Sequence, residues 1–179
     1  NTAVGGTELD PEVEKLDSDN AVINNDGIEK YEEEQQEIKT GKKSKKYPYI
    51  LTNKNGENLT INEPQLWSQL SKNLGPTSNR ITKLFIHTTA GSINDNAIDV
   101  MNYFFHGRKW GRGGYHFLIE KSGKVNQIYK DNTITNGVKG ENSKSIHFSW
   151  IGGYDFKQDG NQMSKGKAIT LVDMIKFYV

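Results

Sequence analysis

Residues 83–92 read KLFIHTTAGS and are the most informative stretch of this chain. A short apolar run leads into His87, two threonines and a turn of small residues, which predicts a central strand of a β-sheet. A histidine at the end of such a strand would be held rigidly at the rim of the sheet, where a metal ligand or a proton-transfer group is useful. A buried histidine bonded to a neighbouring carbonyl is the structural alternative.

The composition allows one ordinary domain with an appendage. The chain has 179 residues, 34% of them hydrophobic, and a mean hydropathy of −0.75, which indicates that part of it is not packed into a core. It has no cysteine, so these residues form neither a disulfide framework nor a thiolate metal site. No apolar run approaches membrane-spanning length, and the first residues do not resemble a signal peptide. The chain does not begin with methionine, so we expect a processed chain or a fragment.

Charge divides the chain into two parts. Residues 1–40 hold twelve of the 22 acidic side chains and only three lysines, whereas residues 41–179 hold twenty basic and ten acidic side chains, a balance of +10. We expect an extended acidic arm and a Lys-rich linker over residues 1–46, with a charged helical stretch at 28–38, and a folded domain over 47–179. A basic body suits a polyanionic surface such as nucleic acid, anionic lipid or cell wall, but charge alone does not choose among them or exclude a role in solubility.

The order of expected elements favours an α/β (α+β) fold with a mixed central β-sheet flanked by helices. The expected strands are 48–52 and 59–61, joined by an Asn-Gly turn, then 83–92, 115–120, 125–129 and 145–153. The expected helices are 63–70, an amphipathic segment within 93–106, and 168–178. No internal repeat of 20–50 residues is visible.

Three short motifs occur in order along this pattern. They are IHTTA at 86–90, GYHFLI at 114–119, and NSKSI at 142–146 followed by IGG at 151–153. Each is weak alone, but together they resemble the type 2 N-acetylmuramoyl-L-alanine amidases, which include bacteriophage lysins and are related to peptidoglycan recognition proteins. The resemblance covers residues 82–179 and nothing before Tyr47.

The resemblance implies a zinc-dependent hydrolase that splits the amide between N-acetylmuramic acid and L-alanine. In such enzymes zinc polarises the carbonyl and lowers the pKa of a bound water to about 7. His87 resembles the first zinc ligand. Tyr115 resembles the family's catalytic tyrosine, whose hydroxyl faces the zinc and the scissile carbonyl, although a packed aromatic at a strand start is its structural alternative.

His147 is a tentative second metal ligand. It would approach the metal or form the cleft floor if its strand neighbours that of His87, and an inward-facing histidine bonded to a neighbour is the equal alternative. His116 alternates with Tyr115 along a strand, so we expect it to face the other way and to be structural. Five residues are expected to bind glycan and stem peptide, although surface loops also carry such residues without function: Thr89, Trp110, Arg112, Lys139 and Asn142.

The remaining zinc ligands of the family lie beyond the helix that resembles residues 165–178, so we expect them beyond Val179. They would belong to a C-terminal fragment of the same precursor or to a trimmed segment, or the site would be lost. The implied partner is bacterial peptidoglycan, reached from a virion or the cell exterior, and residues 1–46 would bind other virion proteins of a phage tail. The alternative function is an inactive peptidoglycan-binding or structural virion component. A membrane partner is not expected, and nucleic acid is not favoured because the aromatics form no base-stacking pattern.

Overall fold

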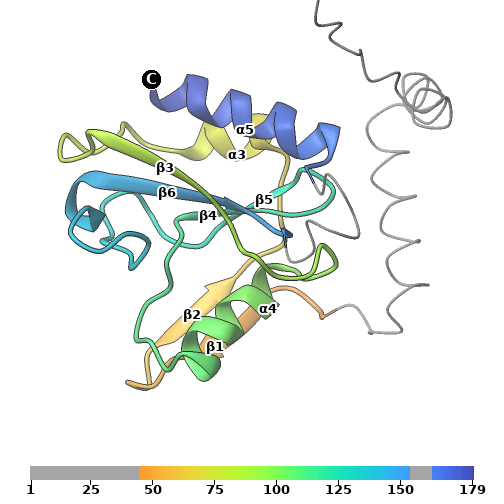
Figure 1. Cartoon of the computed structure of the whole chain (residues 1–179), viewed down its shortest axis with the longest axis vertical. Coiled ribbons are helices and arrows are strands. Elements are labelled where there is room, and N and C mark those ends of the chain that lie inside the picture. The colour runs from red at the N-terminus through yellow and green to blue at the C-terminus, as the bar shows by residue number, and fades with distance from the viewer. Residues whose placement is uncertain (1–44, 154–162) are drawn as a thin grey trace, which may run out of the picture. The chain divides into compact units, whose positions relative to one another are not determined.

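The computed structural model describes residues 45–153 and 163–179 (Figure 1). The expected acidic arm, the helical stretch at 28–38 and most of the Lys-rich linker lie outside these residues. The division of the chain at residues 46 and 47 therefore stays a prediction. In the part that is described, no helix is long and apolar enough to cross a membrane.

The first folded unit is an antiparallel hairpin of β1 (Tyr49–Thr52) and β2 (Asn58–Ile61). Asn53 closes its turn, because its side-chain oxygen accepts from the backbone N–H groups of Asn55 and Glu57. Gly56 has φ +80°, the left-handed conformation that glycine adopts without strain. The predicted hairpin and its Asn-Gly turn are confirmed.

A mixed four-stranded sheet forms the body, as predicted. Its order is β3-β6-β4-β5, with β3 and β4 both parallel to β6 and with β5 antiparallel to β4. The bounds of the strands are β3 Lys83–Thr88, β4 Phe117–Ile119, β5 Val125–Gln127 and β6 Ser145–Trp150.

The prediction that the strand of His87 is central is wrong. Within the described residues β3 lies at an edge of the sheet, and β6 lies between β3 and β4. Burial follows the order, because five of the six residues of β6 are fully buried whereas Ile86 on β3 is 50% exposed. β6 and β4 each have neighbours on both sides, so they are the interior strands of the sheet and β3 is not.

Helices cover both faces of the sheet (Figure 1). One face is covered by α3 (Trp67–Leu70) and α5 (Lys165–Tyr178), and Trp67 and Met174 from these helices join the core around Phe117 and Phe148. α3 is shorter than expected and is followed by the 3-10 turn η1 (Ser71–Asn73). α4 (Ala97–Asn102) and the hairpin form the other core. A second 3-10 turn, η3 (Asn142–Lys144), precedes β6.

α4 begins at a side-chain cap and ends in a π-helical turn. Asn96 and Asp99 form a reciprocal capping box at its N-terminus, as the Asn and Asp residues before it predict. At its C-terminus the chain continues as a π-helical turn, η2 (Tyr103–Gly107). Such a turn accommodates an extra residue and is frequent at functional sites. It therefore changes which side chains face the sheet beyond Asn102.

Candidate functional site

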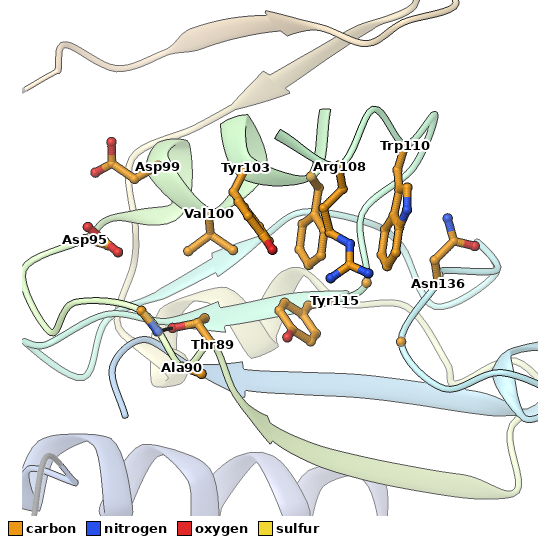
Figure 2. Close-up of a pocket in the computed structure, with 14 residues that line it drawn as sticks. Thr89, Ala90, Asp95, Asp99, Val100, Tyr103, Arg108, Trp110, Tyr115 and Asn136 are labelled. Carbon is orange, nitrogen blue, oxygen red and sulfur yellow. Dashed lines mark hydrogen bonds between the residues drawn. The ribbon is translucent and has the colours of Figure 1, made fainter. Parts of the chain in front are cut away.

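A cavity of about 600 Å³ lies beside the carboxyl end of β3 and is bounded by α4, η2 and the loops around Trp110 and Asn136 (Figure 2). Parallel strands end at one edge of a sheet, and binding sites commonly form there. Its lining residues are Thr89, Ala90, Gly91, Asp95, Asp99, Val100, Tyr103, Phe104, Arg108, Trp110, Gly114, Tyr115, Asn136 and Gly137.

Two histidines meet behind this cavity. In the parallel pairing of β3 with β6, His87 is opposite Ser149 and Phe85 is opposite His147, so the four side chains share one face of the sheet. His87 Nε2 lies 2.9 Å from His147 Nδ1, a hydrogen bond whose direction depends on the tautomers. Neither histidine lines the cavity, but the His87 ring lies 5.2 Å from that of Tyr115, which does.

Burial keeps both imidazoles neutral at pH 7. It lowers the pKa of His87, and it lowers the pKa of His147 to about 4, with the nearby positive charges of protonated His87 and His116 acting in the same direction. The Nε2 atom of His147 is buried without a hydrogen-bond partner in the described part of the chain. The nitrogen of His147 that faces His87 is the other one, Nδ1, and a neutral imidazole has the form that binds metal ions.

Tyr115 joins the histidine pair to the cavity. Its ring contacts the edge of Phe104, with the ring centroids 5.4 Å apart. Burial raises the pKa of its phenol, which the nearby Ser149 hydroxyl and the charge of Arg108 partly offset. The hydroxyl is therefore protonated at neutral pH and can donate a hydrogen bond.

His116 is fully buried beneath this cluster. Its Nδ1 accepts from the backbone N–H of His147 at 3.1 Å, and its Nε2 lies 2.9 Å from the Thr133 carbonyl. β4 begins only at Phe117, so strand alternation does not separate Tyr115 from His116 as expected, and their rings contact His87 and His147 respectively. Because both ring nitrogens of His116 are bonded to backbone groups, this histidine connects β6 to the loop at Thr133.

The residues expected to bind substrate fall into two groups. Thr89 and Trp110 line the cavity. Arg112 donates to the Ile134 carbonyl, Asn142 accepts from the Val138 N–H, and Lys139 is exposed; these three do not line it.

The cavity wall also holds side chains that were not selected from the sequence, among them Tyr103, Arg108 and Asn136. The one hint in the sequence that Arg108 reaches the cavity is its position two residues before Trp110, which was expected to bind substrate. The π-helical turn that orients it is not visible in an apolar pattern.

The donor set for a metal ion is partial. His87 and His147 supply two nitrogens, whereas a catalytic zinc takes three protein ligands and a water. No group of three or more His, Cys, Asp or Glu side chains that could hold a metal ion occurs within residues 45–153 and 163–179. These residues therefore do not make a complete zinc site.

Comparison with known proteins finds a similar phage endolysin and two solved structures with a partial likeness. The chain is 30% identical to the endolysin of Enterobacteria phage K11 over 77 residues, which are 42% of this chain and 51% of that protein, so it spans about half of its relative's length. The phage Ph2119 endolysin of Thermus scotoductus MAT2119 is 26% identical, with a TM-score of 0.46 over 63% of this chain and 77% of that one. Human PGRP-IβC, solved with glycosamyl muramyl pentapeptide, is 16% identical, with a TM-score of 0.45 over 57% and 65% of the two chains.

The sequence match to a family decides the assignment. The family described as N-acetylmuramoyl-L-alanine amidase matches residues 77–175, more than half of the chain. This range contains the three motifs, the histidine pair and all the lining residues of the cavity, and it confirms the resemblance. The chain therefore belongs to the N-acetylmuramoyl-L-alanine amidase family.

Proposed function

We propose that this chain binds bacterial peptidoglycan in the cavity and hydrolyses the amide between N-acetylmuramic acid and L-alanine. The observation that carries the proposal is the Tyr115 phenol in the cavity wall, backed by the His87–His147 pair. Membership of the amidase family and the endolysin relatives support it. The cavity, at about 600 Å³, has the size of sites that hold drug-sized ligands.

Tyr115 suits the electronic demand of amide hydrolysis. When a nucleophile attacks an amide, negative charge develops on the carbonyl oxygen, and a positioned hydrogen-bond donor stabilises it. Since its raised pKa keeps the Tyr115 phenol protonated, the phenol can fulfil this role at neutral pH. Loss of one such donor lowers kcat by about 100- to 1,000-fold in well-studied hydrolases.

We further propose His87 and His147 as two donors to a zinc ion. Both rings are neutral at pH 7, and their nitrogens already lie side by side. When bound, zinc supplies a Lewis acid and an acidic water. The site needs one more protein donor than the described residues provide, so we derive no step of the reaction through the metal.

The site of action belongs to the proposal as well. The endolysin relatives come from phages, which supports action at the bacterial cell wall from a virion or from the cell exterior. Association with a phage tail, through residues 1–46 or through a C-terminal fragment of the same precursor, is proposed on the sequence alone.

Purified sacculi test the proposal. We expect the wild-type protein with zinc to release stem peptides that carry a new N-terminal L-alanine, detected by mass spectrometry. Tyr115→Phe should lower the rate about 100-fold or more with little change in KM. Tyr49→Phe on β1, outside the cavity wall, is the matched control and should keep the wild-type rate. Equal rates for Tyr115→Phe and the control would contradict the assignment of Tyr115.

A binding protein without turnover is the second candidate. The incomplete donor set within the described residues favours it. It predicts that the protein sediments with sacculi at every zinc concentration tested while no L-alanine N-terminus is released. Release that depends on Tyr115 would exclude this candidate.

A further inference from the structure

Arg108 differs from the other two arginines of the chain in how it is used. Arg80 donates to the carbonyls of Asp131, Thr133 and Ser143, and Arg112 donates to that of Ile134. These two arginines hold loops together. Arg108 instead lines the cavity, and Figure 2 shows its guanidinium pointing inward between Tyr103 and Trp110, above Tyr115.

A stack of aromatic rings holds the Arg108 guanidinium. Its central carbon lies 4.5 Å from the centroid of the Trp110 ring. Trp110 in turn stacks on Phe104, with the ring centroids 5.2 Å apart and the planes 13° from parallel. Cation–π contact uses the flat face of the guanidinium, so its N–H edges stay available to a planar, bidentate acceptor such as a carboxylate.

The backbone fixes this stack. The Arg108 N–H donates to the Tyr103 carbonyl at 2.8 Å, and the Trp110 N–H donates to the Phe104 carbonyl at 2.9 Å. Lys109, between them, has φ +55°, a left-handed conformation that reverses the chain within this turn. Because both ends of the turn are bonded to η2, the guanidinium is positioned before a ligand arrives.

The positive charge of Arg108 has no carboxylate partner in the described part of the chain. The two ion pairs found there join Lys45 to Asp99 and Lys83 to Glu141. Asp95 and Asp99 also line the cavity, but Figure 2 shows them at the end opposite to Arg108 and Trp110. The cavity is therefore cationic at one end, where it meets Tyr115.

We propose that Arg108, held on Trp110, is a carboxylate-binding subsite that selects stem peptides with a free carboxylate over their amidated forms. The inference rests on the proposed function in one respect, that the ligand is a muramyl peptide. Arg108 would hold the peptide part of the ligand through two parallel N–H···O bonds. A carboxamide accepts at one oxygen only and carries no charge, so it loses the bidentate ion pair.

Calorimetric titration with two muramyl tripeptides tests the proposal. The first is N-acetylmuramyl-L-alanyl-D-isoglutamyl-L-lysine, and the second is its D-isoglutaminyl counterpart, which differs by one carboxylate converted to a carboxamide. All titrations use chains that carry Tyr115→Phe, which slows turnover. In this background we expect the chain with native Arg108 to bind the first peptide at least about tenfold more tightly than the second, the range of a charge-assisted hydrogen-bond pair. Arg108→Gln should remove this preference, and Arg108→Lys should restore only part of it.

Lys109→Gln is the matched control, since it removes one positive charge from the same turn at a residue outside the cavity wall. It should keep the wild-type preference. Equal affinity of the wild-type site for both peptides, or a preference that survives Arg108→Gln, would overturn the inference and leave the proposed function intact. An equal loss in Lys109→Gln would also overturn it, because general charge would then be the cause. Failure to bind either peptide would contradict the proposed function itself.

Discussion

Gly137 leaves the space that the His147 ring occupies. A Cβ at this position would lie 2.6 Å from His147 Cγ and 2.7 Å from the Gly114 carbonyl oxygen, closer than real Cβ atoms approach their neighbours. We predict that Gly137→Ala displaces the ring from His87 and lowers the free energy of unfolding by about 1–3 kcal/mol, as overpacking does. Urea denaturation measures this change.

Two further variants separate this contact from a general effect of alanine. Gly75→Ala, where a Cβ meets nothing within 4 Å, should change stability by less than about 0.5 kcal/mol. His147→Gly alone should also destabilise the chain, but the double variant Gly137→Ala/His147→Gly should lose less than the sum of the two single losses, because the overlap with the ring disappears. A double variant whose loss is the sum of the two single losses would show that the two residues do not interact.

The buried histidines make stability dependent on pH. Burial lowers the pKa of His116 and of His147 to about 4 in the folded state, against about 6.5 in the unfolded chain. The unfolded state therefore takes up protons first as the pH falls. We predict that the free energy of unfolding is largest above pH 6.5 and decreases steadily towards pH 4.

A single substitution tests whether His116 contributes to this pH dependence of stability. In His116→Asn the decrease between pH 6.5 and 4 should be shallower, since one titrating group is removed. Parallel slopes for the His116 variant and the wild type, measured by urea unfolding in the presence of a chelator, would contradict the assignment.

Among the elements, the β1–β2 hairpin supports the loop that carries Trp110. Asn53 Nδ2 donates to the Gly111 carbonyl at 2.6 Å, and Asn53 is only 7% exposed. We predict that Asn53→Ala costs about 1–3 kcal/mol in unfolding free energy, because the Gly111 carbonyl and the backbone of the turn lose the partner that the largely buried Asn53 provides. It should also weaken binding of muramyl peptide, since the Trp110 turn loses its support. Thr52→Ala, which removes an exposed hydrogen bond of the same hairpin, should change each quantity far less.

The elements also explain which site residues could be predicted. His87 lies within β3 and Tyr115 lies two residues before β4, so the local strand pattern and the family motifs both pointed to them. Arg108 follows η2, and an extra residue in a π-helical turn changes the direction of every later side chain relative to a 3.6-residue period. Arg112, selected from the sequence for its place in a loop, lies outside the cavity wall and donates to the Ile134 carbonyl instead.

For the whole molecule, the sequence predicts the kinds of elements better than their arrangement. The hairpin, the mixed sheet and the final helix each have a local signal in turn residues or periodicity. The edge position of β3 has none, because the order of strands depends on pairings between segments about 60 residues apart. The contact between His87 and His147 depends on the same pairing, so the sequence left open whether the two rings meet.

The claim that peptidoglycan binds in the cavity can be tested most directly by NMR. Three glycine amides, Gly91, Gly114 and Gly137, line the cavity, whereas Gly56 and Gly75 lie in open positions outside it. Titration of the ¹⁵N-labelled chain with N-acetylmuramyl-L-alanyl-D-isoglutamyl-L-lysine should shift the first three amide signals and leave the other two in place. Shifts confined to Gly56 and Gly75, or none at saturating ligand, would contradict the account.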